Sequence, residues 1–147
     1  LGTKELESAV LTVDAVGEAA AVPAFDELRG RVPEMYISLK PGYEGSAKEV
    51  EEEVRQALTR IIGPIARPAH TWVTEDLPKT RSGKIMRRVI AAISNFMDVG
   101  DTTTLANPEV VEAIREQVQS AKIAAGVAPQ QVAKEMAEEV SRFGEEG

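Results

Sequence analysis

Apolar residues recur along the chain with a helical period in some stretches and with a strand-like alternation in others. Helical spacing predicts helices over residues 3–10, between Ser46 and Gly63-Pro64, over 85–97, from Asn107-Pro108 and from about Pro129. Short apolar or alternating runs predict strands over 16–22, 33–39 and 69–74. This order of elements predicts an α+β domain followed by a helical extension.

Capping and breaking residues set the ends of these elements. Ser46 and Glu49 form a capping box, in which each side chain satisfies the other residue's backbone amide. The helix that follows is expected to direct a set of apolar residues inward: Val50, Val54, Ala57, Leu58 and Ile61. Thr3 is expected to cap the helix that ends at Val10, and Asn107 to cap the helix that has Pro108 at its first position. Pro23 is expected to close the first strand.

A change of composition divides the chain into three parts. We expect 1–98 to form the domain, 99–128 a polar linker with an extension helix, and 129–147 a tail helix. The chain starts at Leu1 with no Met and no secretory pattern, which we interpret as a piece of a longer cytoplasmic protein. Its longest apolar run, 19–25, contains a proline and is too short to cross a membrane, so no membrane partner is expected.

Composition excludes several kinds of active site. The 147 residues include no cysteine, which rules out disulfides, thiolate metal sites and cysteine nucleophiles. The single histidine, His70, leaves no pair of histidines for a metal ion and restricts any serine triad to that one residue. His70 is expected at a strand edge or partly buried, with an acid–base role as the alternative.

The net charge of −7 hides a basic segment on an acidic protein. Residues 77–97 carry five basic side chains and no acidic one, which leaves a charge of −12 on the rest of the chain. The five are Lys79, Arg81, Lys84, Arg87 and Arg88. This segment is therefore the candidate site for binding an anion.

The basic segment contains the motif Leu-Pro-Lys-Thr-Arg-Ser-Gly-Lys-Ile-Met-Arg-Arg, residues 77–88. It is not a phosphate-binding P-loop, because a proline stands where the first glycine is required and an isoleucine follows the second lysine. Thr80, Ser82 and Gly83 nevertheless predict a hydrogen-bonding turn. Lys84 lies at or just before the predicted start of a helix, where anions are attracted.

The basic cluster also allows a second interpretation, a stand-alone module that binds RNA or DNA through its phosphates. Against this alternative, the cluster has no interleaved aromatic residues for base stacking. The rest of the chain, at −12, would also repel nucleic acid. We therefore expect no nucleic-acid partner.

The motif of residues 77–88 resembles the C-terminal lysine motif of AMP-forming acyl-CoA synthetases, which are members of the adenylate-forming superfamily. Its spelling is most similar to that of acetyl-CoA synthetase and its short-chain relatives. Further segments resemble the same family: Leu1-Gly2-Thr3, Glu18–Pro23, Gly63-Pro64 and 100–108. The resemblance covers residues 1 to about 118.

The resemblance implies a two-step enzyme of which this chain is the small, mobile C-terminal lid domain. That domain would have a short mixed β-sheet flanked by helices, with a helical C-terminal extension. ATP, CoA and a small carboxylic acid would be the substrates, and the missing N-terminal domain of the same polypeptide would be the main partner. Mg²⁺ would act in the full-length enzyme without binding to this domain, and the isolated chain is expected to be inactive.

The resemblance also implies roles for individual residues. Lys84 would be the catalytic lysine, which contacts carboxylate and phosphate oxygens during adenylation. Acetylation of Lys84 by a protein acetyltransferase, reversed by a deacetylase, would remove its charge. Contacts with ATP or CoA would come from Arg81, Ser82 and Gly83. In the family, an arginine near the end of the capped helix contacts the CoA phosphate. Counting back from Gly63 puts Thr59 at that position, with Arg60 one residue later as the charged candidate.

The other basic side chains of the segment have two open interpretations. They either pair at the surface and within the domain, or give electrostatic support to the bound nucleotide or CoA.

Overall fold

The computed structural model describes residues 2–146, so Leu1 and Gly147, at the ends of the first and last predicted parts, lie outside the described residues. The elements along the chain are α1 (Thr3–Val10), β1 (Val16–Asp26), β2 (Gly30–Leu39), α2 (Ala47–Ile61), the 3₁₀ helix η1 (Pro64–Ala66), β3 (Thr71–Thr74), α3 (Arg87–Ser94), α4 (Glu109–Ala124) and α5 (Pro129–Glu146). They confirm the predicted α+β class. The chain divides into two compact units, 1–21 with 33–77 and 22–32 with 78–147. None of the described helices has the length and apolar character needed to cross a membrane.

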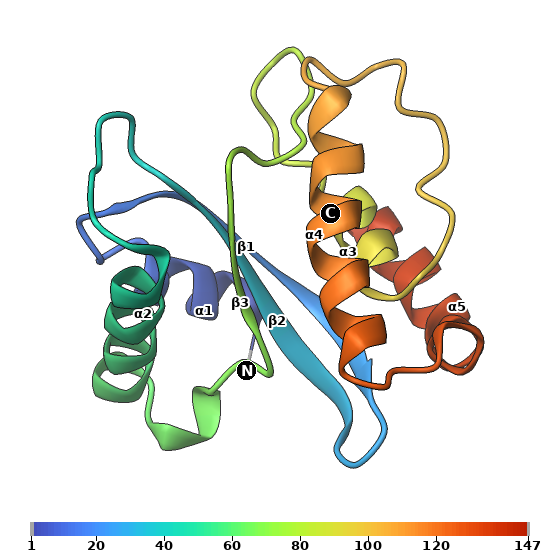
Figure 1. The fold of residues 1–147 in the computed structure, drawn as a ribbon, viewed down its shortest axis with the longest axis horizontal. Coiled ribbons are helices and arrows are strands. Elements are labelled where there is room, and N and C mark those ends of the chain that lie inside the picture. The colour runs from blue at the N-terminus through green and yellow to red at the C-terminus, as the bar shows by residue number, and fades with distance from the viewer. Residues whose placement is uncertain (1, 147) are drawn as a thin grey trace. The chain divides into compact units, whose positions relative to one another are not determined.

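The first unit has its own apolar core beside α1 and α2, which lie next to each other (Figure 1). Ser46 caps α2 as predicted, since its hydroxyl accepts a hydrogen bond from the Glu49 N–H at 3.1 Å. Helices and strands of this unit share the buried residues Leu6, Ala9, Val10, Val13, Ala19, Ala21, Met35, Ile37, Val50, Val54, Ala57 and Leu58. The prediction for Ile61 is wrong: it is 48% exposed, because α2 ends there and the side chain borders a surface pocket.

Within the described residues, the sheet has three strands in the order β1-β2-β3. A three-residue turn joins β1 to β2, which makes this pair antiparallel, whereas β2 and β3 pair in parallel with Met35 opposite Thr71. The sheet is therefore mixed, as predicted. The predicted strand end at Pro23 is wrong, because β1 continues to Asp26. An edge strand tolerates a proline, since one of its sides makes no ladder hydrogen bonds.

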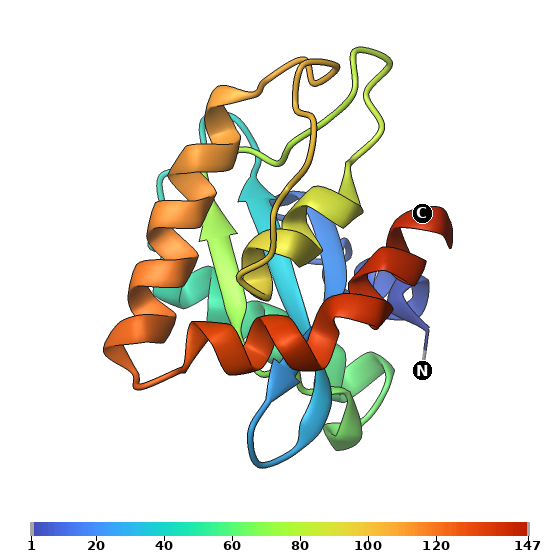
Figure 2. The same cartoon turned by 90° about the vertical axis from the view of Figure 1, so that its right-hand side faces the viewer.

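In the second unit, α3 packs against both α4 and α5. Figure 2 shows α5 running past α3 after the turn that ends α4. The helices of this unit bury Val89, Ile90, Ala92, Ile93, Val111, Ile114, Val118, Val132, Met136 and Val140. Two side chains of α4 also bind the last carbonyls of α3: Gln119 Nε2 donates to Ile93 O at 3.0 Å, and Lys122 Nζ donates to Ser94 O at 2.8 Å.

α3 is shorter than predicted at both ends, since it spans Arg87–Ser94 rather than 85–97. At the start, Ile85 pairs with Lys79 in an antiparallel bridge and so is not available to the helix. At the end, the side-chain amide of Asn95 folds back and donates to a carbonyl of the last helical turn at 2.8 Å.

α4 begins at Glu109, with Pro108 as the cap residue instead of the predicted Asn107. The Asn107 side chain does act as an acceptor, but for a distant segment. Its Oδ1 accepts a hydrogen bond from the backbone N–H of Lys79 at 2.9 Å. A side chain suited to capping is thus used to join two parts of the second unit.

Candidate functional site

Residues 78–86 form a small antiparallel structure, here called the lysine hairpin, with Lys84 near its tip (yellow-green in Figure 1). Lys79 and Ile85 form an antiparallel bridge between its two arms. Closer to the tip, the Thr80 N–H donates to the Lys84 carbonyl at 2.8 Å. Lys84 therefore belongs to a hairpin, and α3 begins only at Arg87, which corrects the prediction of a helix starting directly at or after Lys84.

The tip of the lysine hairpin is a tight turn organised by Thr80. The Gly83 N–H donates to the Thr80 carbonyl at 2.9 Å, and the Lys84 N–H donates to Thr80 Oγ1 at 3.1 Å. Ser82 Oγ lies 3.0 Å from the same Oγ1. Gly83 has a φ of +93°, in a region that residues with a side chain rarely adopt. The backbone N–H and carbonyl of Lys84 are thus both hydrogen-bonded to Thr80.

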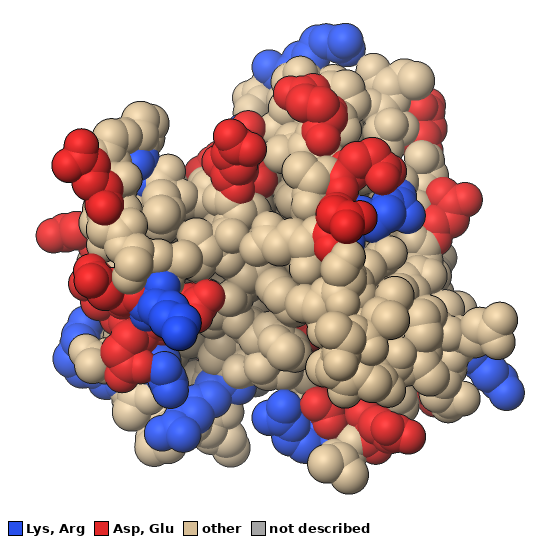
Figure 3. All heavy atoms as spheres, viewed as in Figure 1, with Lys and Arg blue, Asp and Glu red and all other residues tan. Residues whose placement is uncertain are grey.

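The predicted contact residues of the motif come together at this tip and face solvent. Arg81, Ser82, Gly83 and Lys84 are all exposed. Neither Arg81 nor Lys84 forms an ion pair with another described residue. Lys and Arg atoms gather at the upper edge of Figure 3, where the lysine hairpin projects in Figure 1. Two cations without a local counter-charge are suited to binding an external carboxylate or phosphate.

The remaining basic side chains of the segment have partners inside the molecule. Arg88 Nη1 donates to the Val99 carbonyl at 3.1 Å. Lys79 and Arg87 also make contacts within the chain, and all three residues are only partly exposed. The geometry therefore separates the two cations at the tip from the basic residues behind it.

Arg60 belongs to α2 in the first unit, whereas the lysine hairpin belongs to the second unit. Arg60 is exposed and makes no ion pair with a described residue, whereas Thr59 is partly buried. Arg60 borders a pocket of about 230 Å³ that Asp14 and Glu53 also line. Two carboxylates beside one guanidinium weaken the attraction of this pocket for a phosphate. Among the side chains that the structure describes, residues 2–143, no three His, Asp or Glu groups gather closely enough to hold a metal ion.

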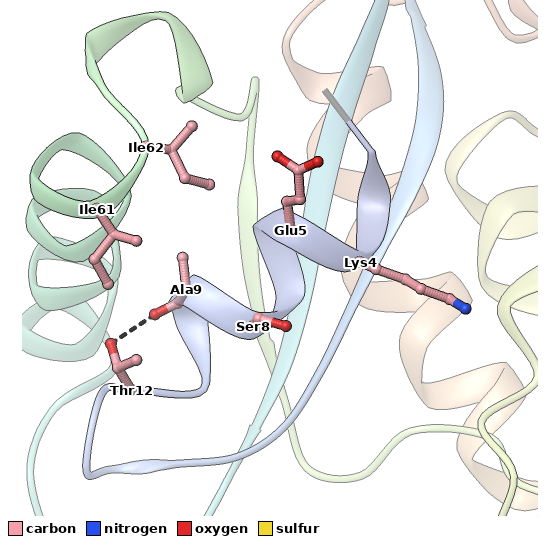
Figure 4. Close-up of a pocket in the computed structure, with 7 residues that line it drawn as sticks. All are labelled: Lys4, Glu5, Ser8, Ala9, Thr12, Ile61 and Ile62. Carbon is pink, nitrogen blue, oxygen red and sulfur yellow. Dashed lines mark hydrogen bonds between the residues drawn. The ribbon is translucent and has the colours of Figure 1, made fainter.

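A larger pocket, of about 460 Å³, lies between α1 and the C-terminal end of α2 (Figure 4). Ile61 and Ile62 form one wall. On the other wall, the Thr12 hydroxyl donates to the Ala9 carbonyl at 2.7 Å, and Lys4 points away from the isoleucines. The pocket has no set of converging polar groups, so the lysine hairpin is the stronger candidate for chemistry.

The sequence motif did not reveal what holds the lysine hairpin in place. The Ala106 N–H donates to the Lys79 carbonyl at 2.8 Å, and Thr80 forms an antiparallel bridge with Leu105. Leu105 is 2% exposed, although the run before it was expected to be a polar linker. Leu105 directly follows the polar residues 100–104, and this isolated apolar residue was the one sequence signal that the segment packs against the domain.

Residues 5–84 match the family model described as the AMP-binding enzyme C-terminal domain. The acetyl-coenzyme A synthetase of Rubrobacter xylanophilus is 46% identical over 123 residues, which make up 83% of this chain and 19% of that protein. The acetyl-coenzyme A synthetase of Pyrobaculum aerophilum is 43% identical over 122 residues, 83% of this chain and 18% of that protein. The chain thus spans about a fifth of the length of these curated relatives.

Solved structures agree on the fold. An acyl-CoA synthetase of Brucella canis superposes with a TM-score of 0.55 at 36% identity, covering 61% of this chain and 16% of that one. The acetoacetyl-CoA synthetase from Streptomyces lividans gives a TM-score of 0.62 over 82% of this chain and 18% of that one, and at 14% identity it shows the fold alone. The relatives named here are CoA synthetases, so they do not favour the alternative of a nucleic-acid-binding module.

Proposed function

The chain belongs to the AMP-binding enzyme C-terminal domain family, and we propose that it is the mobile lid of an AMP-forming acetyl-CoA or other short-chain acyl-CoA synthetase. The observation that carries the proposal is the placement of Lys84, an exposed cation on a turn whose backbone is held by hydrogen bonds. Lys84 is also the last residue matched by the family model. The relatives from Rubrobacter xylanophilus and Pyrobaculum aerophilum are both acetyl-coenzyme A synthetases. Their names support a short carboxylic acid as the substrate.

In the first half-reaction, a carboxylate oxygen would attack the α-phosphorus of ATP. The bond between that phosphorus and the pyrophosphate oxygen breaks, giving an acyl-adenylate and pyrophosphate. Two anions must approach each other in this step, and negative charge builds up on the phosphate oxygens. The Lys84 ammonium would lie against both groups and stabilise that charge, while Arg81, Ser82 and Gly83 contact the nucleotide. The Mg²⁺ that accompanies ATP would be bound outside this chain.

In the second half-reaction, the lid would rotate and withdraw Lys84. The CoA thiol then attacks the carbonyl carbon of the acyl-adenylate, AMP leaves with the carboxylate oxygen, and the thiol proton passes to solvent. Arg60 or Thr59 would contact the CoA phosphate. Arg60 brings charge and exposure. Thr59 stands at the position that the resemblance implies for the family's arginine.

The proposal is tested by Lys84→Ala in the full-length enzyme that contains this chain. Removing one preorganised cation is expected to slow adenylate formation by roughly 10²–10³-fold, measured as acetate-dependent pyrophosphate release. Thioester formation from a supplied acyl-adenylate and CoA should change far less. Lys48→Ala, which removes an exposed lysine from α2, is the matched control and should leave both half-reactions unchanged.

Two results would contradict the proposal. Equal losses in both half-reactions for Lys84→Ala would assign the lysine a structural role. Thioester formed by the 147-residue chain alone from ATP, acetate and CoA would show that the rest of the site is not needed.

We also propose that the same lysine is a regulatory site. An acetyl group on Lys84 Nζ would turn the ammonium into a neutral amide and remove the charge used in adenylation. The exposed tip is accessible to a protein acetyltransferase and to a deacetylase. Acetylation should therefore reproduce the selective loss of adenylation seen with Lys84→Ala.

A further inference from the structure

The lysine hairpin is paired along its outer edge with a segment that lies beyond the family-model match. This segment, Val99–Asn107, is here called the strap. The Ala106 N–H donates to the Lys79 carbonyl at 2.8 Å, and Asn107 Oδ1 accepts from the Lys79 N–H at 2.9 Å. Both backbone groups of Lys79 are thus bound by the strap. Figures 1 and 2 show the strap reaching the lysine hairpin just before α4 begins.

The strap is attached to the rest of the second unit near both of its ends and has one internal turn. At its start, the Val99 carbonyl accepts from Arg88 Nη1 at 3.1 Å. In its middle, Asp101 Oδ1 accepts from the backbone N–H of Thr103 at 2.9 Å. Near its end, Leu105 is buried. A segment with these contacts is better suited to support a neighbouring turn than a flexible linker is.

We propose that Asn107 is a positioning residue for Lys84, an inference that rests on the proposed function of that lysine. The connection runs through two neighbouring residues. Asn107 holds the backbone amide of Lys79, and the next residue, Thr80, holds both backbone groups of Lys84. Movement of Lys79 away from the strap would therefore move the turn that carries the lysine.

The role needs a side-chain acceptor at this place. A backbone N–H at the outer edge of a hairpin has no partner within the hairpin, and water binds it without fixing its position. Asn107 is followed by Pro108, which restricts Asn107 to an extended backbone and limits the directions its side chain takes. The acceptor is therefore preorganised. A misplacement of about 1 Å in a catalytic group costs up to about 10²-fold in rate, so a modest loosening is measurable.

The test uses the full-length enzyme and three variants. Asn107→Ala removes the acceptor and is expected to lower the rate of adenylation roughly tenfold, with KM for ATP and acetate little changed. Asn107→Asp keeps an oxygen in place and should restore most of that rate. Gln119→Ala removes another side-chain to backbone hydrogen bond of the second unit, at α3, and is the matched control. It should lower thermal stability without a selective loss of adenylation.

Hydrogen exchange gives a second readout that does not depend on activity. The backbone amides of Lys79 and Lys84 should exchange faster in Asn107→Ala than in the wild type, and near the wild-type rate in Asn107→Asp. If Asn107→Ala does not fold, Asn107→Ser replaces it, because the shorter serine side chain does not reach the Lys79 amide. The exchange rates of the Lys79 and Lys84 amides are then compared between this variant and the wild type. Combined with Lys84→Ala, Asn107→Ala should cause no further loss of adenylation, because both act through one group.

The outcomes separate this inference from the function it rests on. A wild-type rate of adenylate formation in Lys84→Ala would contradict the proposed function of Lys84, whatever the result for Asn107→Ala. A strong loss with Lys84→Ala but none with Asn107→Ala would overturn only the positioning role. Equal losses for Asn107→Ala and Gln119→Ala, or equal losses in both half-reactions, would overturn it too.

Discussion

Two exposed turns of the second unit share a local design but differ in what holds them. One joins β1 to β2 over residues 26–30, and the other is the tip of the lysine hairpin, residues 80–84. Each contains a glycine with a positive φ, +76° at Gly30 and +93° at Gly83. The two turns therefore impose the same kind of backbone requirement on their sequences.

Each turn also places a short polar side chain at its first residue. Asp26 Oδ1 accepts from the N–H groups of Leu28 and Arg29 at 2.9 and 3.0 Å. Thr80 Oγ1 accepts from the Lys84 N–H at 3.1 Å. Side chains of this kind stabilise turns by satisfying nearby backbone amides. Local chemistry alone thus does not distinguish the turn with the proposed catalytic role.

The difference lies in the distant contacts. Next to the β1–β2 turn, Arg31 Nε lies 2.8 Å from Glu139 Oε1, an exposed ion pair of a kind worth about 0–1 kcal/mol. The lysine hairpin instead has its edge paired with the strap through backbone groups and Asn107. Bonds to a distant segment therefore fix the position of the side chain at the tip of the lysine hairpin more tightly than local turn chemistry does.

Exchanging each glycine for alanine is expected to give the largest difference between the two turns. An added Cβ would meet no atom within 4 Å at Gly30 or Gly83, so each change costs backbone strain alone, about 1–2 kcal/mol. In the full-length enzyme, Gly83→Ala should also displace Lys84 and reduce adenylation roughly tenfold. Gly30→Ala should lower the melting temperature without that loss. Equal rates of pyrophosphate release in the two variants would remove the distinction.

Removing the polar side chains is expected to give a smaller, local effect. In the 147-residue chain, Thr80→Val and Asp26→Ala should each lower the free energy of unfolding in urea by about 1 kcal/mol. Amide exchange should separate them: Thr80→Val exposes the Lys84 amide, and Asp26→Ala exposes those of Leu28 and Arg29. Accelerated exchange in both turns for either variant would show that the turns are coupled.

The smallest expected difference is in pH dependence. The backbone amide of Arg29 holds the pKa of Asp26 below its usual range. A lowered pKa stabilises the β1–β2 turn above the unfolded pKa of about 3.9, and this contribution is lost as the pH falls through the folded value. The hydroxyl acceptor of Thr80 does not titrate there. In an NMR titration, the Arg29 amide should shift with a midpoint below 3.9, and the Lys84 amide should not.

An Asp26→Asn variant is the control for this titration, because it keeps an oxygen acceptor without a titrating proton. Its Arg29 amide should lose the low-pH shift. A midpoint at or above the usual aspartate value in the wild type would contradict the assigned hydrogen bond.

Most helices and strands follow from signals within a few residues of each other. The predicted helix ending at Val10 is present as α1, although its cap residue is Gly2 and not Thr3. Ser46 caps α2 as expected. The errors arise where a distant partner intervenes. β1 passes Pro23 because it is an edge strand, and α3 starts late because Ile85 pairs in the lysine hairpin.

The α+β class, the basic segment and the motif that contains Lys84 could all be predicted from the sequence, because composition, periodicity and motif spelling are properties of neighbouring residues. The tertiary structure decided which of the basic side chains stay exposed and what holds the turn that carries them. Lys79 and Asn107 are 28 residues apart, and no local pattern links two groups at that separation. Their hydrogen bond exists only because α3 and the buried Leu105 bring the strap to the edge of the lysine hairpin.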